Sequence, residues 1–214
     1  MDDLTCRLEV ARVARLLYDR QLVTTCEGNV SLLCENRVYV TPSQVCKGFL
    51  TPEQIVVTDR QGKALEWAGK PSSEIGLHLF LYDTRPDVAA VVHTHSPFAT
   101  AFALACKPIE SQGYTEMLLL HGRIPVVSYG APGTPDIARD IPRYIQETDM
   151  LLLANHGVVA VGKTVEEAYE KAETVEALAK TLLFTQLLGG EVPLPPKDRE
   201  ELIRRRAAAG GQQV

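Results

Sequence analysis

Residues 88–95 read Val-Ala-Ala-Val-Val-His-Thr-His, and this stretch decides both the fold and the chemistry. Its β-branched and apolar residues are typical of a buried strand. Residues two apart in a strand project from the same face, so His93 and His95 are expected to point at one spot. Such a pair suits a divalent metal ion, although His-x-His alone is a weak motif and a histidine in an apolar strand is commonly a core residue.

A third imidazole is available far downstream. His156 follows the apolar residues 150–154 and is expected to lie in a second buried strand. Three neutral histidines leave a zinc ion with its positive charge and at least one open coordination position. That arrangement is typical of a catalytic rather than a structural zinc site.

Composition limits the classes of protein. The chain has 214 residues, of which 45% are hydrophobic and 23% charged, as in an ordinary soluble protein, and we expect one domain over 1–214 with a linker and short helix in 192–214. The formal net charge of -5 provides no broad basic surface for nucleic acid or membrane. No apolar run approaches the ~18 residues of a membrane span.

Cysteine usage points to a reducing compartment. The five cysteines are odd in number and have no Cys-x-x-Cys spacing, which argues against a disulfide framework and a cysteine zinc site. The first helix begins with Asp2 and Asp3 rather than a basic region, so no signal peptide is recognised. We expect a cytoplasmic protein.

Hydrophobic periodicity predicts helices and strands in alternation. Helices are expected over 3–20, 72–82, 97–106, from 134 onward, over 164–188 and in the charged C-terminal segment. Strands are expected in two hairpins, 29–33 with 37–40 and 55–58 with 64–67, and then over 88–95, 124–127, 150–156 and 158–161. Thr164 with Glu167 is expected to form a capping box. The pattern favours an α/β fold of α+β type, with a largely antiparallel central sheet.

Pro71-Ser72-Ser73-Glu74 is expected to open a helix. Exposed amides, the positive end of the helix dipole and two hydroxyls make such an end suitable for an anion. A serine cap with a favourable first-turn acid accounts for the same residues. If this end faces the histidines, Glu74 could ligate the metal or act as a general base.

Three further segments carry candidate polar groups. Gly28-Asn29 and Thr41-Pro42-Ser43 could bind a phosphate through backbone N–H groups and short side chains, or could be ordinary turns. Tyr114 lies in a polar loop, where it is either a proton donor or a packed side chain.

Five motifs together resemble one family. They are Glu27-Gly28-Asn29-Val30-Ser31, Thr41-Pro42-Ser43, Lys70-Pro71-Ser72-Ser73-Glu74, Val92-His93-Thr94-His95-Ser96 and Asn155-His156-Gly157. Their order and spacing resemble the class II aldolases of the aldolase/adducin superfamily, and most of all its fuculose-1-phosphate aldolases. The resemblance spans roughly residues 5–188 and implies a single three-layer domain.

The resemblance also implies a site and an activity. It implies a zinc ion, with Mn²⁺ or Co²⁺ as alternatives, held by His93, His95, His156 and Glu74. Glu74 would also be the acid/base in cleavage of a ketose 1-phosphate to dihydroxyacetone phosphate and an aldehyde, which is lactaldehyde for fuculose 1-phosphate. The substrate phosphate would be bound by Gly28, Asn29, Ser43, Gln44, Ser72 and Ser73. Tyr114 would protonate the aldehyde oxygen across a subunit boundary of a homotetramer whose active sites lie between subunits.

The chemistry agrees with that implication. Zinc, as a Lewis acid, stabilises the enediolate left by C3–C4 cleavage, so no lysine Schiff base is required. No nicotinamide or flavin motif is present. Two departures from the family are Gln44, where glycine is common, and the lack of any aromatic residue in 204–214.

Other members of the superfamily are alternatives. A pentulose-5-phosphate 4-epimerase uses the same three-histidine zinc but carries aspartate where Glu74 stands, which favours the aldolase. A methylthioribulose-1-phosphate dehydratase shares the metal site. An adducin-like binding module keeps the fold without catalysis, and retention of all three histidines and Glu74 argues against it.

Overall fold

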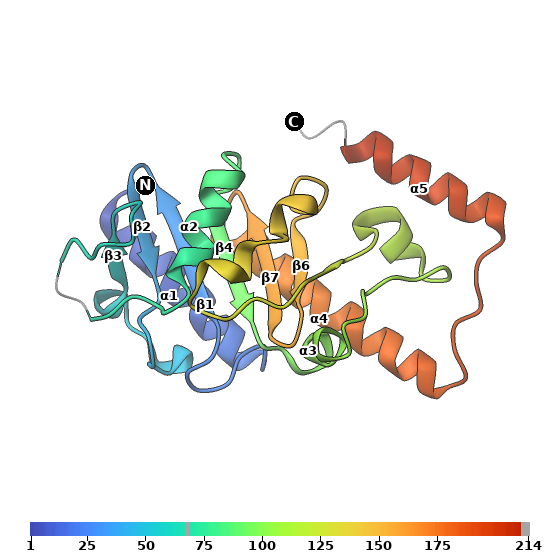
Figure 1. The fold of residues 1–214 in the computed structure, drawn as a ribbon, viewed down its shortest axis with the longest axis horizontal. Coiled ribbons are helices and arrows are strands. Elements are labelled where there is room, and N and C mark those ends of the chain that lie inside the picture. The colour runs from blue at the N-terminus through green and yellow to red at the C-terminus, as the bar shows by residue number, and fades with distance from the viewer. Residues whose placement is uncertain (67–68, 211–214) are drawn as a thin grey trace.

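A seven-stranded sheet organises the described part of the chain, residues 1–66 and 69–210 of a computed structural model (Figure 1). The strand order is β3-β2-β1-β4-β7-β6-β5, and every neighbouring pair is antiparallel except β5 with β6. The strands are β1 Asn29–Cys34, β2 Arg37–Val40, β3 Val56–Thr58, β4 Ala90–Thr94, β5 Val126–Val127, β6 Met150–Leu153 and β7 Gly157–Gly162. The stretch 88–95 therefore supplies the middle strand, β4, whose five residues are all buried.

Helices and short helical turns cover both faces of the sheet. The helices are α1 Asp3–Asp19, α2 Ile75–Thr84, α3 Pro97–Leu104, α4 Val165–Leu187 and α5 Pro196–Gly210. The turns are η1 Lys47–Phe49, η2 Pro52–Gln54, η3 Met117–His121, η4 Pro135–Ala138 and η5 Ile141–Arg143. None of the described helices is both long and apolar enough to cross a membrane.

Alternation along the strands separates two apolar layers. Val92 and Ala160 belong to the layer under α1 and α4, which α3 extends toward β6. Val91 and Val159 belong to the opposite layer, under α2, η4 and η5. His93, two residues after Val91, consequently points to the α2 side. The arrangement confirms the predicted three-layer α/β fold with a mostly antiparallel sheet.

Several predicted elements are confirmed closely. The first helix and the hairpin of β1 and β2 occur where the pattern placed them. Thr164 caps α4 by accepting from the backbone N–H of Glu167. The reciprocal half of the predicted capping box differs, because the Glu167 carboxylate accepts from Lys163 N instead of Thr164 N.

Other predicted boundaries are wrong. The helix expected from Ser72 begins at Ile75, because residues 71–74 form the turn that leads into it. The helix expected from Thr134 is only the η4 turn, since Pro142 follows within two helical turns and prevents a longer helix. In the second hairpin, Ala64 makes a single bridge to Thr58, and Trp67 lies outside the described residues, as do 211–214 of the tail.

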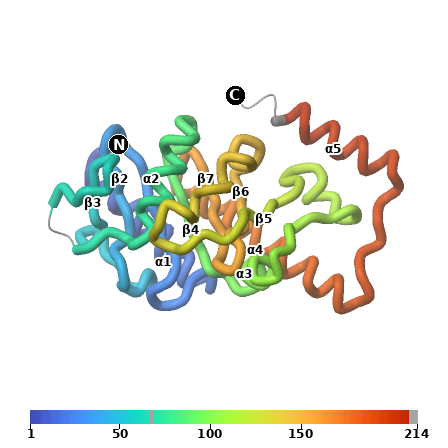
Figure 2. Tube along the Cα trace, viewed as in Figure 1, coloured from blue at the N-terminus to red at the C-terminus, as the bar shows by residue number. Residues whose placement is uncertain are grey.

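The C-terminal helix stands apart from the sheet. The tube in Figure 2 shows α5 at one end of the molecule, reached by an extended connection after α4. It contacts η3, where Arg206 donates a hydrogen bond to Leu118 O at 2.8 Å. The predicted linker and helix within 192–214 are therefore present, and the helix runs for 15 residues.

Candidate metal centre

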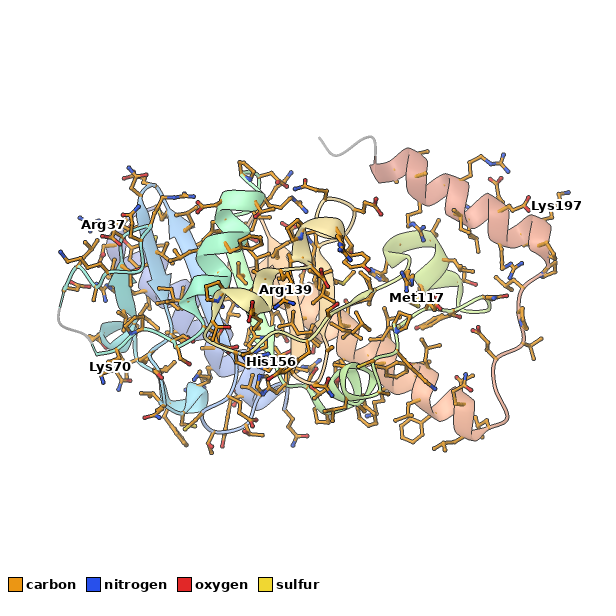
Figure 3. The ribbon with its side chains drawn as sticks, in the orientation of Figure 1. Arg37, Lys70, Met117, Arg139, His156 and Lys197 are labelled. Carbon is orange, nitrogen blue, oxygen red and sulfur yellow. The ribbon has the colours of Figure 1, made fainter. Side chains whose placement is uncertain are left out.

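Four predicted ligands come together at one end of β4. One ligand atom from each of Glu74, His93, His95 and His156 lies within 4.8 Å of the others. Glu74 immediately precedes α2, His93 belongs to β4, and His156 lies between β6 and β7; Figure 3 shows His156 at the middle of the molecule. Three segments far apart in sequence thus meet at one point.

The strand assignments of two ligands were wrong in detail. β4 ends at Thr94, so His95 lies just beyond the strand. β6 ends at Leu153, so His156 belongs to the turn into β7 rather than to the strand. This turn is possible because Asn155 adopts a φ of 59°, a left-handed conformation that asparagine tolerates better than most residues. Pairing of Thr94 with Val158 then brings the turn beside the end of β4.

A backbone contact fixes the tautomer of His93. Its Nδ1 lies 2.7 Å from Val158 O, and a carbonyl oxygen only accepts, so Nδ1 carries the proton. The lone pair is therefore on Nε2, the nitrogen that faces the cluster. Histidine ligands of metal ions are oriented by this kind of contact.

The centre of the cluster is rich in lone pairs. Glu74 Oε2 lies 3.3 Å from His93 Nε2, and Glu74 Oε1 lies 3.4 Å from His156 Nε2. These separations are close to the roughly 3.3 Å between ligand atoms of a tetrahedral zinc ion. Glu74 Oε1 is buried and has no hydrogen-bond partner among the described residues. A cation between these atoms would satisfy that oxygen, so the residues fit a divalent metal ion.

Burial keeps the imidazoles in the form that coordinates metals. Removal from water, with a smaller effect of the neighbouring His156, lowers the pKa of His93 to about 3. Burial and the two other imidazoles lower the pKa of His95 to about 4, and burial also lowers the pKa of His156. All three are thus neutral near pH 7, with a nitrogen lone pair to donate.

Two glycines allow the close packing of the ligand segments. A Cβ on Gly157 would lie 2.4 Å from Thr94 O and 3.0 Å from Cδ2 of His95. A Cβ on Gly28 would lie 2.7 Å from His93 O, and this glycine has a φ of 67°. Glycine at both positions is therefore a condition for the geometry of the histidines.

The candidate phosphate segments lie side by side. Thr41 N donates to Val30 O at 3.0 Å, Ser72 N donates to Thr41 O at 3.2 Å, and Ser43 N donates to Lys70 O at 3.0 Å. These bonds join the segments that contain Asn29, Ser43 and Ser72–Ser73. Gln44 has a φ of 58°, so it adopts the left-handed backbone for which glycine is the usual residue.

The sequence reasoning missed Lys47, which is fully buried at 1% exposure. Its ammonium donates to Cys26 O at 3.1 Å and to Val45 O at 3.0 Å, so it ties together the loops before Gly28 and after Gln44. No carboxylate forms an ion pair with it in the described part of the chain. Burial lowers its pKa. The sequence around Lys47 gave little indication that this side chain is buried, apart from three apolar or small neighbouring residues.

Asn29 contacts the candidate ligand Glu74 directly. Its Nδ2 donates to Glu74 Oε2 at 3.0 Å, and its Oδ1 lies 2.5 Å from His78 Nε2. The side chain that the family resemblance assigned to phosphate is thus engaged with Glu74. His78 was also missed, although it lies one helical turn after Glu74, a spacing that places both on one face of α2.

Tyr114 does not lie with the candidate metal ligands or with the phosphate segments. Its ring packs against the cluster of Ala99, Met117 and Leu178, on the α3 and α4 side of the sheet, whereas Glu74 directly precedes α2 and His93 points to the α2 side. Figure 3 shows Met117, which follows the same loop, well to one side of His156.

Fold and site together define an enzyme of the class II aldolase type, a lyase that breaks a carbon–carbon bond by retro-aldol cleavage. The chain belongs to the Class II Aldolase and Adducin N-terminal domain family, which it matches over residues 8–183. It is 42% identical to the L-fuculose phosphate aldolase of Methanococcus vannielii over 80% of this chain and 92% of that one. It is 34% identical to the 3-oxo-tetronate 4-phosphate decarboxylase of Escherichia coli K12, over 83% and 86% of the two chains. A solved L-fuculose 1-phosphate aldolase superposes with a TM-score of 0.84 at 27% identity, covering 94% of this chain and 95% of that one.

Proposed function

We propose that the protein is a zinc-dependent aldolase that cleaves a ketose 1-phosphate, with fuculose 1-phosphate as the first candidate, to dihydroxyacetone phosphate and an aldehyde. The observation that carries the proposal is the cluster of three neutral histidines around the unpaired Oε1 of Glu74. Similarity to an L-fuculose phosphate aldolase over most of both chains supports the substrate.

His93, His95, His156 and Glu74 would hold the ion, for which Mn²⁺ and Co²⁺ are alternatives to zinc. A bound ion would supply Lewis-acid chemistry, that is, stabilisation of the negative charge that develops on the substrate during C3–C4 cleavage. His95 is the most exposed of the four side chains, at 23%, so the ketose would approach the ion from the side of His95.

Two residues would move protons in the reaction. Cleavage removes the proton of the C4 hydroxyl, and the three-carbon product needs a proton at C3. Glu74 would take up a proton and then deliver it to C3, because its Oε1 faces the cluster without another partner. Tyr114 would take the proton that leaves the C4 hydroxyl while its own proton passes to solvent, so that no proton is gained or lost overall.

The phosphate would lie over the joined loops of Gly28–Asn29, Ser43–Gln44 and Ser72–Ser73. Ser73 is exposed, and Ser72 Oγ accepts from Glu74 N at 3.3 Å, so the serine turn lies next to Glu74 at the start of α2. The buried ammonium of Lys47 adds positive charge behind these loops. A dianionic phosphate would offset that charge.

A homotetramer with active sites between subunits is part of the proposal. Tyr114 packs on the face of the sheet opposite the ligands, so it would act on the site of another copy. Exposed apolar side chains at Phe184, Leu187, Leu188 and Val192 provide surface for such an assembly. We also propose that residues 1–214 form one domain and, from the five free thiols, that the protein works in the cytoplasm.

A coupled assay for dihydroxyacetone phosphate tests the proposal. The zinc-loaded protein is given fuculose-, rhamnulose-, ribulose- and 5-deoxyribulose 1-phosphate, with Glu74→Gln in parallel. We expect cleavage of at least one ketose 1-phosphate and a kcat lower by about 10²–10⁴-fold in Glu74→Gln. No cleavage of any of the four by zinc-loaded protein would refute the aldolase.

A decarboxylase is the second candidate, because a 3-oxo-tetronate 4-phosphate decarboxylase is 34% identical. Release of carbon dioxide from a 3-oxo-tetronate 4-phosphate, without release of dihydroxyacetone phosphate in the first assay, would favour it. Epimerised ribulose 5-phosphate would indicate an epimerase, and loss of water from methylthioribulose 1-phosphate a dehydratase. A purified chain without a stoichiometric divalent ion would favour a binding module.

A further inference from the structure

A chain of buried side chains leads from Glu74 into the layer between α2 and the sheet. Asn29 Nδ2 donates to Glu74 Oε2, and Asn29 Oδ1 lies 2.5 Å from His78 Nε2. His78 Nδ1 lies 2.6 Å from Ser31 Oγ, which lies 2.5 Å from the hydroxyl oxygen of Tyr82. None of the five residues is more than 9% exposed.

Secondary structure places these residues in two rows. Glu74 directly precedes α2, and His78 and Tyr82 follow it at intervals of four residues within the helix, so the three side chains form a row along one side of α2. Asn29 and Ser31 are two apart in β1, so they share the face of the sheet that lies under α2. The two rows interleave, and each side chain from one contacts a side chain from the other.

The direction of every hydrogen bond in this relay follows from the chemistry of the groups. Asn29 donates from its NH₂ group to a carboxylate oxygen of Glu74 and therefore presents its Oδ1 to His78. The Oδ1 only accepts, so the proton of His78 is on Nε2. Nδ1 then has a lone pair and accepts from the Ser31 hydroxyl, whose oxygen accepts in turn from Tyr82.

The charge state of His78 agrees with this assignment. Burial, together with the nearby His93, lowers the pKa of His78 to about 3, so its imidazole carries a single proton at neutral pH. One proton is what the relay requires, because a second one on Nδ1 would prevent this nitrogen from accepting from the Ser31 hydroxyl.

We propose that His78, Ser31 and Tyr82 are positioning residues that hold Glu74 in a single orientation through Asn29. The inference rests on the proposed function, in which Glu74 is both ligand and proton carrier. The relay fixes Oε2, which leaves Oε1 free toward His156 for the proton transfer. Apolar side chains in the same layer would avoid the cost of desolvating four polar groups, so the relay provides orientation rather than stability.

The tautomer of His78 is the most direct test. Long-range ¹H–¹⁵N spectra of the full-length ¹⁵N-labelled protein at pH 7, without metal and with zinc, distinguish protonated from unprotonated ring nitrogens. We expect a proton on Nε2 and none on Nδ1 in both samples, with the resonances assigned by their loss in His78→Gln. A proton on Nδ1, or on both nitrogens, would overturn the relay.

A pair of substitutions tests whether the relay affects the metal centre. His78→Gln retains an N–H near the position of Nε2, whereas His78→Leu removes it. Zinc affinity, measured by competition with a chromophoric chelator, is expected to fall about 10–100-fold in His78→Leu, as for other groups that orient metal ligands, and to recover largely in His78→Gln. Unchanged affinity in His78→Leu, or equal losses in both variants, would contradict a positioning role.

Tyr82→Phe has a matched control in Tyr39→Phe. Both tyrosines are buried and hydrogen-bonded, but Tyr39 donates to Asp3 at the far side of the sheet and is not part of the relay. We expect Tyr82→Phe, unlike Tyr39→Phe, to lower zinc affinity, by less than His78→Leu does. Equal affinity in the two variants would remove Tyr82 from the relay. Neither affinity nor tautomer depends on substrate, so failure to cleave any ketose phosphate would leave this test intact.

Discussion

The metal centre and the arm formed by residues 184–210 are built in opposite ways. The ligands of the metal centre come from the ends of strands and a helix, are largely buried, and are held by contacts within one chain. The arm extends away from the sheet and exposes Leu187, Leu188 and Val192 at 76%, 87% and 87%. This difference teaches that a single chain brings the four candidate metal ligands together by itself, whereas the role proposed for Tyr114 at the aldehyde requires a second copy of the chain.

Removal of the metal ion should have the largest effect of the changes considered, and it should act on cleavage and not on assembly. Dialysis against a chelator is expected to lower cleavage by at least about 10³-fold, because Lewis-acid stabilisation contributes several kcal/mol to the transition state. Oligomeric mass, measured by light scattering, should stay the same, since the arm contains none of the ligands. Dissociation of the oligomer on chelation would show that the two regions are coupled.

Tyr114→Phe should affect proton transfer at the aldehyde oxygen and leave the metal site unchanged. We expect kcat to fall about 10²-fold with zinc content unchanged, because the phenol is a proton donor and not a ligand. Mixed oligomers of Tyr114→Phe with Glu74→Gln should regain activity, since some sites then combine an intact Glu74 with an intact Tyr114 from another chain. Without such recovery, Tyr114 would not act across a subunit boundary.

The buried histidines should make the metal-free protein sensitive to acid. The pKa values of His78, His93 and His95 are about 3, 3 and 4 in the folded protein, against an ordinary value of 6.5. Between these values the unfolded chain binds protons that the folded chain does not. The free energy of unfolding is therefore at its full value above pH 6.5. It decreases as the pH falls below 6.5, by up to about 1.4 kcal/mol per pH unit for each histidine.

Urea unfolding of metal-free protein at pH 7 and pH 5 measures this loss. His78→Gln serves as the control, because it removes one of the protons and should flatten the dependence. A free energy of unfolding that does not change between the two pH values would mean that the imidazoles are not buried as described.

Gly157→Ala tests how tightly the ligand segments pack. The added Cβ would lie 2.4 Å from Thr94 O, so the end of β4 and the start of β7 must separate. We expect a loss of about 1–3 kcal/mol in the free energy of unfolding, as for other overpacked sites, together with weaker zinc binding. Gly76→Ala is a matched control, because nothing lies within 4 Å of the added atom and the residue is in α2.

Gln44→Gly should have the smallest effect. Gln44 has a φ of 58°, which costs a residue with a side chain roughly 1–2 kcal/mol, and the greater freedom of glycine in the unfolded chain offsets part of that gain. Thermal unfolding should show stability that is equal or up to about 1 kcal/mol higher. The KM for the cleaved ketose phosphate should not rise, because the backbone keeps its conformation; a clear rise would assign the glutamine side chain to the phosphate site.

Much of the site could be predicted from local sequence. The i,i+2 spacing of His93 and His95 and the buried-strand pattern placed both on one face, and the structure brings them together with His156 and Glu74. Boundaries were less accurate: His156 lies in a turn and α2 begins at Ile75, because residues on either side of an element's end have similar local preferences. Lys47 and His78 were missed because neither spacing nor composition shows that a polar side chain is buried.

The sequence by itself determined the strand pattern, because hydrophobic period is a local property, and the ligand types and class of enzyme through five motifs that resemble those of class II aldolases. Only the tertiary structure decided that Asn29 contacts Glu74, that His78, Ser31 and Tyr82 continue the relay, and that Tyr114 packs on the opposite face. Those facts depend on which strand lies under which helix. Pairing of β1 with β4 and the packing of α2 over both strands bring together residues that are 45 or more positions apart in the chain.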